Sequence, residues 1–334
     1  MTGLAIEARE RALEVIRNGE RFLLVTHEHP DGDALGSLIA MHGVLTALGK
    51  DSLMFMAAEE LPLPYEYRFF ALDGLVSLPP EDLDERIVIF LDCGNIDRNP
   101  VEVVQRNGSR ILNLDHHHDN TRFGDVNMVV PDASCTAEII WDLMHALGVH
   151  PTREVAEALY VAVVTDTGKF MYENTGPRAH LMAADLIAAG IDVHEIYRRL
   201  YEGMPYSKLE LLGRALAHVR RYDDGQLTIA VLGRDDFRMS GADDSHSEGV
   251  IDHLRSVEGT KVAALARELV DAAGEGRKKV SLRSTDGEID VSAIARAGGG
   301  GGHRRAAGFT TTFSEEQLVA FLREEMTAQV GGAA

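Results

Sequence analysis

Carboxylate and imidazole side chains gather in four short clusters in the first half of the sequence, each directly after an apolar run. The clusters are His27-Glu28-His29-Pro30-Asp31-Gly32-Asp33, Asp92-Cys93-Gly94-Asn95, Asp115-His116-His117-His118 and Thr165-Asp166-Thr167-Gly168. Carboxylate oxygens bind hard divalent cations, and imidazole nitrogens shift the preference towards transition metals such as Mn²⁺. Together the clusters can hold two ions side by side, an arrangement suited to phosphoester hydrolysis.

The first cluster offers three metal donors on a tight loop that opens a helix. Asp31 and Asp33 are two residues apart, so in an extended loop they point the same way and each can serve one ion. His27 lies just before them, and Gly32 permits an unusual backbone conformation between them. The alternative interpretation is structural, with Asp33 as the cap of a helix that starts at residue 34.

The other three clusters can complete a two-metal site. Asp92 ends an apolar run and can bridge both ions, while His116 and Asp166 can complete the second ion's ligands. His117 would then face the phosphate and donate a hydrogen bond to the developing charge or the leaving oxygen. Asp115 can hold a ring N–H of a neighbouring histidine.

Composition and charge limit the class of protein. With 334 residues, 45% hydrophobic and 26% charged, the chain is typical of a globular protein with two domains or one large one. No apolar stretch is long enough to span a membrane, no secretory signal is visible, and the two cysteines favour a reducing compartment, so we expect a cytoplasmic protein without a membrane partner. We expect Cys93 to be a packing residue.

The formal net charge of −20 disfavours binding of long duplex nucleic acid, which needs many Lys and Arg contacts. A deep site for a few nucleotides fits this charge better, because metal ions supply a local positive field. The charge is compatible with a monomer or a homodimer.

The order of apolar runs predicts an α/β fold. We expect strands at residues 21–26, 52–56, 87–91 and 111–114, and helices at residues 5–19, 34–48, 133–147 and 153–164. Strands alternating with helices indicate a parallel sheet covered on both faces, with ligands beyond the carboxyl ends of its strands. The first three clusters lie at such ends, and the fourth follows a helix.

The pattern changes in the second half of the chain. Residues 191–217 are predicted as a helical linker between a domain of residues 1–190 and a smaller α/β domain of residues 218–330. In that second domain we expect strands at 227–232, 262–269 and 279–283, and helices at 290–297 and 314–326, the last capped by Ser314 and Gln317.

The four clusters, in this order and spacing, resemble the motifs of the DHH phosphoesterase superfamily. The segment Gly-Gly-Gly-Gly-His303-Arg-Arg-Ala-Ala-Gly-Phe, with Ser281-Leu-Arg283-Ser284 upstream, is similar to the DHHA1 domain. The two domains at this length resemble the NrnA-like branch of the superfamily. The resemblance implies a parallel-sheet DHH domain, a smaller DHHA1 domain and an active site in the cleft between them. It also implies a phosphodiesterase that degrades very short RNA or DNA to mononucleotides and removes the 3′-phosphate of pAp.

The resemblance further implies roles for individual residues. One Mn²⁺ would be held by His27, Asp31 and Asp92, and a second by Asp33, Asp92, His116 and Asp166, with Mg²⁺ or Co²⁺ as substitutes. Catalysis would involve His117, Asp115 and Asp92, with His117 on the scissile phosphate. Substrate would be gripped by Arg283, Ser284, Gly300, Gly301, Gly302 and His303. On composition alone, the glycine run is a flexible loop, the alternative to a phosphate cradle.

Three other functions stay open. The same site could act on cyclic dinucleotides such as c-di-AMP, or on pApA. A RecJ-type single-strand exonuclease is disfavoured by the charge and by the lack of room for a further nucleic-acid-binding domain. A nucleotide sensor without catalysis is disfavoured because every expected ligand residue is present.

Overall fold

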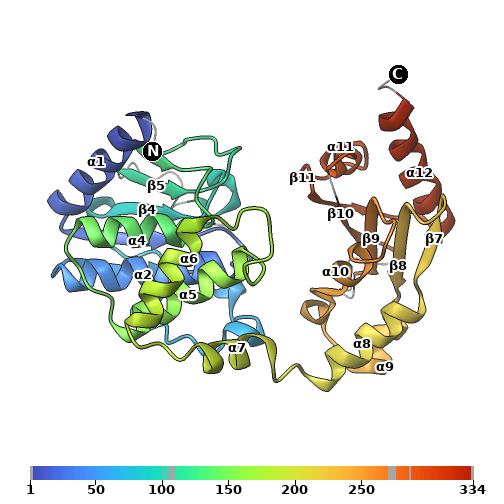
Figure 1. The fold of residues 1–334 in the computed structure, drawn as a ribbon, viewed down its shortest axis with the longest axis horizontal. Coiled ribbons are helices and arrows are strands. Elements are labelled where there is room, and N and C mark those ends of the chain that lie inside the picture. Colours follow the sequence, from blue (N-terminus) through green and yellow to red (C-terminus); the bar gives the residue numbers. More distant parts are fainter. Residues whose placement is uncertain are drawn as a thin grey trace. The chain divides into compact units, whose positions relative to one another are not determined.

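The computed structural model describes residues 3–99, 101–102, 104, 110–269, 276–285 and 287–331. The chain divides into two compact units, Met1–Glu202 and Gly203–Ala334 (Figure 1). Each unit has its own sheet and its own buried apolar clusters.

The sheet of the first unit is parallel throughout. Its strand order is β3-β2-β1-β4-β5-β6. The strands are β1 (Arg21–Val25), β2 (Asp51–Phe55), β3 (Leu75–Val76), β4 (Ile87–Leu91), β5 (Ile111–Asp115) and β6 (Val126–Val129). The four strands predicted from the sequence are confirmed to within one residue at each end, and β3 and β6 are additions.

Apolar side chains of these strands alternate between the two faces of the sheet. Phe22 and Leu24 belong to the large core that also contains the helices, whereas Leu23 and Val25 belong to a smaller cluster on the other face with Leu83. This double burial explains why the strands are apolar at nearly every position. The helices of this unit are α1 (Gly3–Asn18), α2 (Gly32–Ala47), α4 (Thr136–Ala146), α5 (Arg153–Asp166), α6 (Pro177–Ala188) and α7 (Val193–Tyr201).

Short 3-10 turns complete the first unit and the connections between its strands. They are η1 (Ala58–Glu60), η2 (Tyr65–Tyr67), η3 (Leu83–Glu85) and η4 (Ile96–Arg98). Within the residues that the structure describes, no helix is long and apolar enough to cross a membrane. Cys93 is fully buried against the smaller cluster, and burial raises the pKa of its thiol to about 12, which confirms its packing role.

The second unit has a mixed sheet in the order β11-β12-β10-β9-β8-β7, in which only the β8–β9 pair is parallel among the described strands. The strands are β7 (Arg220–Tyr222), β8 (Leu227–Leu232), β9 (Val262–Glu268), β10 (Lys278–Ser284), β11 (Gly301–His303) and β12 (Ala306–Thr311). The helical elements are α8 (Tyr206–Ala217), α9 (Arg234–Ser240), η5 (Asp244–Ser247), α10 (Val250–Arg255), α11 (Val291–Ala297) and α12 (Glu315–Gly331).

Two details of the second unit test the sequence analysis directly. Ser314 and Gln317 form the predicted capping box, since each side chain accepts a hydrogen bond from the other residue's backbone N–H at 3.2 and 2.9 Å. The glycine run is not a flexible loop, because Gly301–His303 forms strand β11 in register with β12. The flexible-loop alternative was wrong for these residues because β12 approaches so closely that a Cβ at Gly302 would lie 2.6 Å from Ala307 Cα.

Candidate metal centre

The site lies at the point where the strand order of the first sheet reverses. β1 and β4 are neighbours, and the chain continues from β1 to β2 on one side and from β4 to β5 on the other. Ligands of open α/β sheets bind at such a switch point, beyond the carboxyl ends of the strands. His27 follows β1, Asp92 follows β4 directly, and Asp115 is the last residue of β5. The sheet topology therefore brings the first three clusters together.

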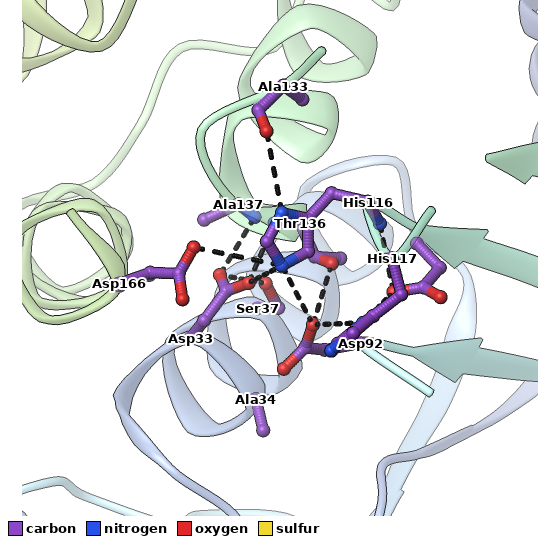
Figure 2. A network of polar contacts seen from close by, with 12 residues as sticks. Asp33, Ala34, Ser37, Asp92, His116, His117, Ala133, Thr136, Ala137 and Asp166 are labelled. Carbon is purple, nitrogen blue, oxygen red and sulfur yellow. Dashed lines mark hydrogen bonds and ion pairs between the residues drawn. The ribbon is translucent and has the colours of Figure 1, made fainter. Parts of the chain in front are cut away.

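Three groups of metal-donor residues meet at this edge. Figure 2 shows the two groups that contain His116. Within each group, the donor atoms all lie within 4.8 Å of one another. The groups are His27–Asp31–Asp92, Asp33–His116–Asp166 and Asp92–His116–His117. Asp92 and His116 each belong to two groups. All six residues expected to bind metal are thus placed together, around a shared carboxylate.

Asp92 lies between two imidazoles. Its Oδ2 is 3.5 Å from His27 Nε2, and its Oδ1 is 3.6 Å from His116 Nε2. His116 Nε2 also lies 3.7 Å from Asp166 Oδ2 and 4.0 Å from Asp33 Oδ2. Figure 2 shows His116 directed into the space bounded by these three carboxylates. The two oxygens of Asp92 therefore face different histidines, as a bridging ligand requires.

The backbone fixes which ring nitrogen each histidine offers. His27 Nδ1 lies 2.7 Å from the carbonyl oxygen of Glu28, and His116 Nδ1 lies 3.4 Å from that of Ala133. A carbonyl oxygen can only accept a hydrogen bond, so Nδ1 carries the proton. The lone pair of each neutral ring is then on Nε2, which faces the carboxylates. Metal-binding histidines are held in this way by their second nitrogen.

Backbone donors hold the carboxylate of Asp33 in place. Its oxygens accept hydrogen bonds from the N–H groups of Thr136 and Ala137, at 2.7 and 3.0 Å, and from Ser37 Oγ at 3.2 Å. Thr136 and Ala137 open α4, where backbone N–H groups are without partners in the helix. The Thr136 hydroxyl also donates to Asp92 Oδ1 at 3.1 Å. One helix terminus therefore orients two proposed ligands.

Asp31, and not Asp33, caps α2, so the alternative role considered for Asp33 was wrong. Asp31 Oδ1 accepts hydrogen bonds from the backbone N–H groups of Asp33 and Ala34, at 3.0 and 3.1 Å. Gly32 also differs from expectation, since its backbone is not in the left-handed region. A Cβ at this position would lie 2.3 Å from Thr165 Oγ1, so glycine is required for space.

Asp166 is the last residue of α5, next to an unusual turn. Asn174 Nδ2 donates to its carbonyl oxygen at 3.1 Å and to its carboxylate at 3.2 Å. Gly168, Lys169 and Phe170 follow with φ angles of 54°, 64° and 63°. Two of these left-handed residues have side chains, which costs energy that the surroundings must supply. Asp92 is likewise left-handed, with φ of 55°, so strain collects at the site.

Asp115 orients the second histidine of its cluster. It is fully buried, and its Oδ1 lies 2.7 Å from His117 Nδ1 and accepts the N–H of His116 at 2.9 Å. Asn120 Nδ2 donates to the other oxygen of Asp115 at 2.5 Å. His118 is exposed and outside the three donor groups, so the third cluster directs only two imidazoles inwards.

Burial and mutual repulsion shift the pKa values of the carboxyl groups. Burial raises the pKa of Asp33 well above its usual value, and the charge of Asp92 adds to the effect. Burial also raises the pKa of Asp166 to about 7, although His116 acts in the opposite direction. Burial acts to raise the pKa of Asp92, but its close contact with His27 and the charges of the imidazoles outweigh burial and lower it.

The nearby carboxylates raise the pKa values of two imidazoles. Burial lowers the pKa of His117, but its hydrogen bond with Asp115 and the charges of Asp92 and Asp115 raise it overall, to about 9. Burial acts to lower the pKa of His27, but its close contact with Asp92 and the charges of Asp92 and Asp31 outweigh burial and raise it. The charge of Arg98 acts against both shifts.

These donors fit divalent metal ions. Imidazole-to-carboxylate distances of 3.5–4.0 Å exceed those of hydrogen bonds, typically about 2.7–3.2 Å. Carboxylates whose pKa values rise through burial and repulsion are stabilised when a cation lies between them. The mixture of carboxylate oxygens and imidazole nitrogens is a donor set of first-row divalent metals. The first unit therefore carries a divalent-metal site.

Several residues of the site were missed by sequence reasoning. Thr136, Asn120 and Asn174 hold ligands through hydrogen bonds, and Arg98 adds a positive charge. Arg98 follows the second cluster closely, and its backbone oxygen accepts from Glu28 N at 2.8 Å, so its proximity was the one available signal. No signal in the sequence indicated Thr136, because it lies 103 residues from Asp33.

The proposed substrate residues lie in the second unit. Arg283 on β10 is opposite Ala306 on β12, which is opposite His303 on β11, so the three backbones are in one row across the sheet. The side chain of His303 lies outside the described residues. Ser284 is buried and its hydroxyl accepts the N–H of Gly287 at 3.1 Å.

Two of the glycines named as substrate-binding have a packing reason to be glycine. A Cβ at Gly300 would lie 2.1 Å from the carbonyl oxygen of Gly308, and Gly302 combines a φ of 135° with a Cβ position 2.6 Å from Ala307 Cα. At Gly301, no atom lies within 4 Å of the Cβ position. Packing therefore does not account for glycine at Gly301.

Sequence comparison identifies the two halves of the chain. The DHH family, N-terminal domain, matches residues 21–163, and the DHHA1 domain matches residues 224–331. A protein of Thermus thermophilus named bifunctional oligoribonuclease and PAP phosphatase NrnA is 34% identical over 268 residues, which are 79% of this chain and 76% of the relative. The chain belongs to the DHH/DHHA1 family, in its NrnA-like branch. A Bacillus subtilis protein of the same name is 25% identical over 72% of this DHH/DHHA1 chain and 76% of the relative.

Solved structures agree with this DHH/DHHA1 fold. An exopolyphosphatase-related protein of Bacteroides fragilis superposes with a TM-score of 0.88 at 23% identity, covering 98% of both chains. An exonuclease RecJ bound to manganese superposes with a TM-score of 0.53 at 18% identity, covering 99% of this chain and 95% of that one. At these identities the likeness concerns the fold alone.

Proposed function

We propose that this DHH/DHHA1 phosphoesterase degrades RNA oligonucleotides of a few residues to mononucleotides and removes the 3′-phosphate of pAp, with Mn²⁺ as its metal. The observation that carries the proposal is the convergence of three donor groups on Asp92 and His116 in a chain of the NrnA-like branch. The relatives' name covers both activities, and a hydrolytic site that acts on phosphoesters serves both.

The proposed ligands divide into two sets that share Asp92. His27, Asp31 and Asp92 would hold one ion, and the second would be held by Asp33, Asp92, His116 and Asp166. Divalent ions bound there supply Lewis-acid activation of the phosphate and of the attacking water. Two imidazoles among the donors favour Mn²⁺ over Mg²⁺, with Mg²⁺ or Co²⁺ as substitutes.

The surrounding residues hold this arrangement before substrate arrives. Thr136 keeps Asp92 oriented through its hydroxyl and Asp33 through its backbone N–H. Because these donors are buried and already in place, little reorganisation is needed during the reaction. Asp115 does the same for His117 at 2.7 Å.

His117 is the group that would meet the scissile phosphate. Without bound metal, its pKa is raised to about 9, and the hydrogen bond with Asp115, which does not involve the metal ligands, contributes to this shift and favours the protonated imidazole. Its Nδ1 is engaged by Asp115, so Nε2–H is left to donate to a phosphate oxygen or to the leaving sugar oxygen. Water attacks the phosphorus, the bond to the sugar oxygen breaks, and that oxygen takes a proton.

The DHHA1 unit would bind the substrate. Arg283 suits a phosphate because its guanidinium can donate two parallel hydrogen bonds. Exposed Gly301 leaves its backbone open to a phosphate, consistent with the proposed contribution of Gly300, Gly301, Gly302, Ser284 and His303. The net charge of −20 favours short single strands over long duplexes. A homodimer and a cytoplasmic location stay predictions from the sequence.

A single assay tests the proposal. Purified protein with Mn²⁺ is given RNA of two to about ten nucleotides, pAp and cyclic di-AMP, and the products are separated by chromatography. We expect turnover of the shortest RNAs and of pAp. Asp92→Asn, which tolerates the left-handed backbone of this position, should lose turnover while its circular dichroism spectrum is unchanged. Asp97→Asn, on an exposed residue nearby, is the matched control. Activity retained in Asp92→Asn would overturn the two-metal account, and turnover confined to cyclic di-AMP would overturn the substrate assignment.

A further inference from the structure

The second unit contains a pocket of about 350 Å³ between β9, β10 and the segment around α10. Pockets that bind small ligands are typically about 300–1,000 Å³. Three basic side chains line this one: Arg267 from β9, and Lys279 and Arg283 from β10. Arg283 already has a proposed role in binding substrate, whereas Arg267 and Lys279 have none.

Strand geometry places these cations in a row. Lys279, Ser281 and Arg283 alternate with the buried Val280 and Leu282, so they share one face of β10. At about 3.3 Å per residue, Lys279 and Arg283 are about 13 Å apart along the strand. This is the distance between their backbones, and it is larger than one phosphate group. Side chains that start so far apart can each bind a different phosphate group, one at each end of the row.

At the Lys279 end of the row, two positively charged side chains lie next to each other. Lys279 is directly opposite Arg267 in the β9–β10 register, and like charges opposite each other destabilise a sheet. Arg267 is paired with Asp244, at 3.1 Å between Nη1 and Oδ2. Lys279 is exposed and has neither an ion pair nor a hydrogen bond with any residue that the structure describes.

The acidic residues of the pocket lie on its other wall. Glu248 precedes α10 and Asp252 belongs to it. Asp252 is paired with Arg255, at 3.4 Å between Oδ1 and Nη2. The wall formed by β9 and β10 is thus basic, and Lys279 and Arg267 are its cations at the end away from Arg283.

We propose that Lys279 and Arg267 form a second phosphate-binding position. When one phosphodiester group of an RNA is bound at Arg283, this position receives another phosphodiester group further along the same RNA chain. The inference rests on the oligoribonuclease activity proposed above. It makes this pocket a determinant of substrate length. An RNA of several nucleotides occupies both ends of the row, whereas pAp, with a single nucleoside, is too short to do so.

The test compares two substrates in full-length protein with Mn²⁺. Values of kcat/KM are measured for a five-nucleotide RNA and for pAp in wild type, Lys279→Ala and Lys278→Ala. Lys278 is the matched control, because it carries the same charge one residue earlier on β10, and its Nζ donates to the carbonyl oxygen of Phe313 at 3.0 Å. Lys279→Ala should lower the ratio of kcat/KM for RNA to kcat/KM for pAp about tenfold, because one charged hydrogen bond to the RNA is lost. The change should lie mainly in KM for RNA. Lys278→Ala should leave the ratio unchanged.

Salt dependence provides a second readout. Loss of one phosphate contact to a single strand should reduce the slope of log kcat/KM for RNA against log salt by about 0.7 in Lys279→Ala. An unchanged ratio and slope, or the same change in Lys278→Ala, would overturn the proposal and leave the cations as partners of the acidic wall. If wild type hydrolysed neither RNA nor pAp, the proposed function itself would fail before any variant was compared.

Discussion

Nδ1 of His117 lies 2.7 Å from Oδ1 of Asp115, and that carboxylate is completely buried. Asp115 is further held by Asn120, so the histidine is fixed by a chain of hydrogen bonds that starts outside the metal ligands. The geometry makes Asp115 a positioning residue for His117. It orients the ring and supports its charge without touching the reacting atoms.

Replacing Asp115 should therefore impair turnover more than metal binding. We expect Asp115→Asn to lower kcat roughly 10- to 100-fold with little change in KM, because His117 loses its orientation and charge partner. Steady-state kinetics with pAp and an Mn²⁺ titration measure the two effects. Asp119→Asn, at an exposed neighbouring residue, should retain wild-type kcat. An Asp115→Asn enzyme with normal kcat would remove this role.

The hydroxyl of Thr136 should tune metal affinity. Thr136→Val keeps the shape of the side chain and the backbone N–H that Asp33 accepts, but removes the donor to Asp92. Loss of such an outer contact typically weakens metal binding about 10- to 100-fold. Calorimetric titration with Mn²⁺ measures the change, and Thr136→Ser, which keeps the hydroxyl, should restore most of the affinity. Equal affinity in Thr136→Val and wild type would contradict the prediction.

Metal-free and metal-loaded protein should respond oppositely to pH. Folding raises the pKa of Asp166 to about 7 from about 3.9 in an unfolded chain, so between these values the folded state binds a proton that the unfolded state has released. The contribution of Asp166 to stability without metal is therefore fully present below about pH 4 and is lost as pH rises from about 4 to about 7. His117 adds a loss of the same sign up to about pH 9.

Bound metal reverses this trend because it requires deprotonated carboxylates. At about 100 times its Kd, Mn²⁺ should add about 2.7 kcal/mol of stability, and more as pH rises from 5 to 8. Thermal unfolding in EDTA and in Mn²⁺ across this range tests both statements. Curves that fall in parallel with pH would show that the acidic cluster does not hold the ion.

Close packing of α2 on α5 should set the distance between two ligands. A Cβ at Gly36 would lie 2.4 Å from the carbonyl oxygen of Ala158, so Gly36→Ala forces the helices apart. Such overpacking costs about 1–3 kcal/mol, and it separates Asp33 on α2 from Asp166 on α5, which should weaken Mn²⁺ binding.

A second glycine provides the control for this change. Gly213 of α8 has open space at its Cβ position, so Gly213→Ala should stabilise the protein by up to about 1 kcal/mol and leave Mn²⁺ affinity unchanged. Denaturant unfolding and metal titration of both variants measure the difference. Wild-type metal affinity in a destabilised Gly36→Ala would mean that loops, and not the helix contact, set the ligand spacing.

The sequence allowed prediction of the parallel sheet and the convergence of the clusters, because both follow from apolar runs that end in polar residues. It could not distinguish the roles of Asp31 and Asp33. The two residues lie two positions apart on one loop. Asp31 caps α2, whereas Asp33 accepts a hydrogen bond from Thr136, which is 103 residues away in the sequence. Contacts of that range leave no pattern in a single sequence.

Elements without strong periodicity were also missed. β6 contains an asparagine among apolar residues in Val126–Val129, and β3 has only two residues, so neither has a run long enough to predict. β11 was obscured by its glycines, which favour turns in composition but here fit the close approach of β12. Packing against a neighbour, and not local preference, decides these segments.

The ligands extend along the chain from residue 27 to residue 166, and no short segment contains a complete donor group. A chain emerging from the ribosome can therefore complete the group Asp33–His116–Asp166 only after α5 has left the exit tunnel, whereas His27, Asp31 and Asp92 are all present well before. Chains that end before Asp166 would lack one ligand of the second proposed ion.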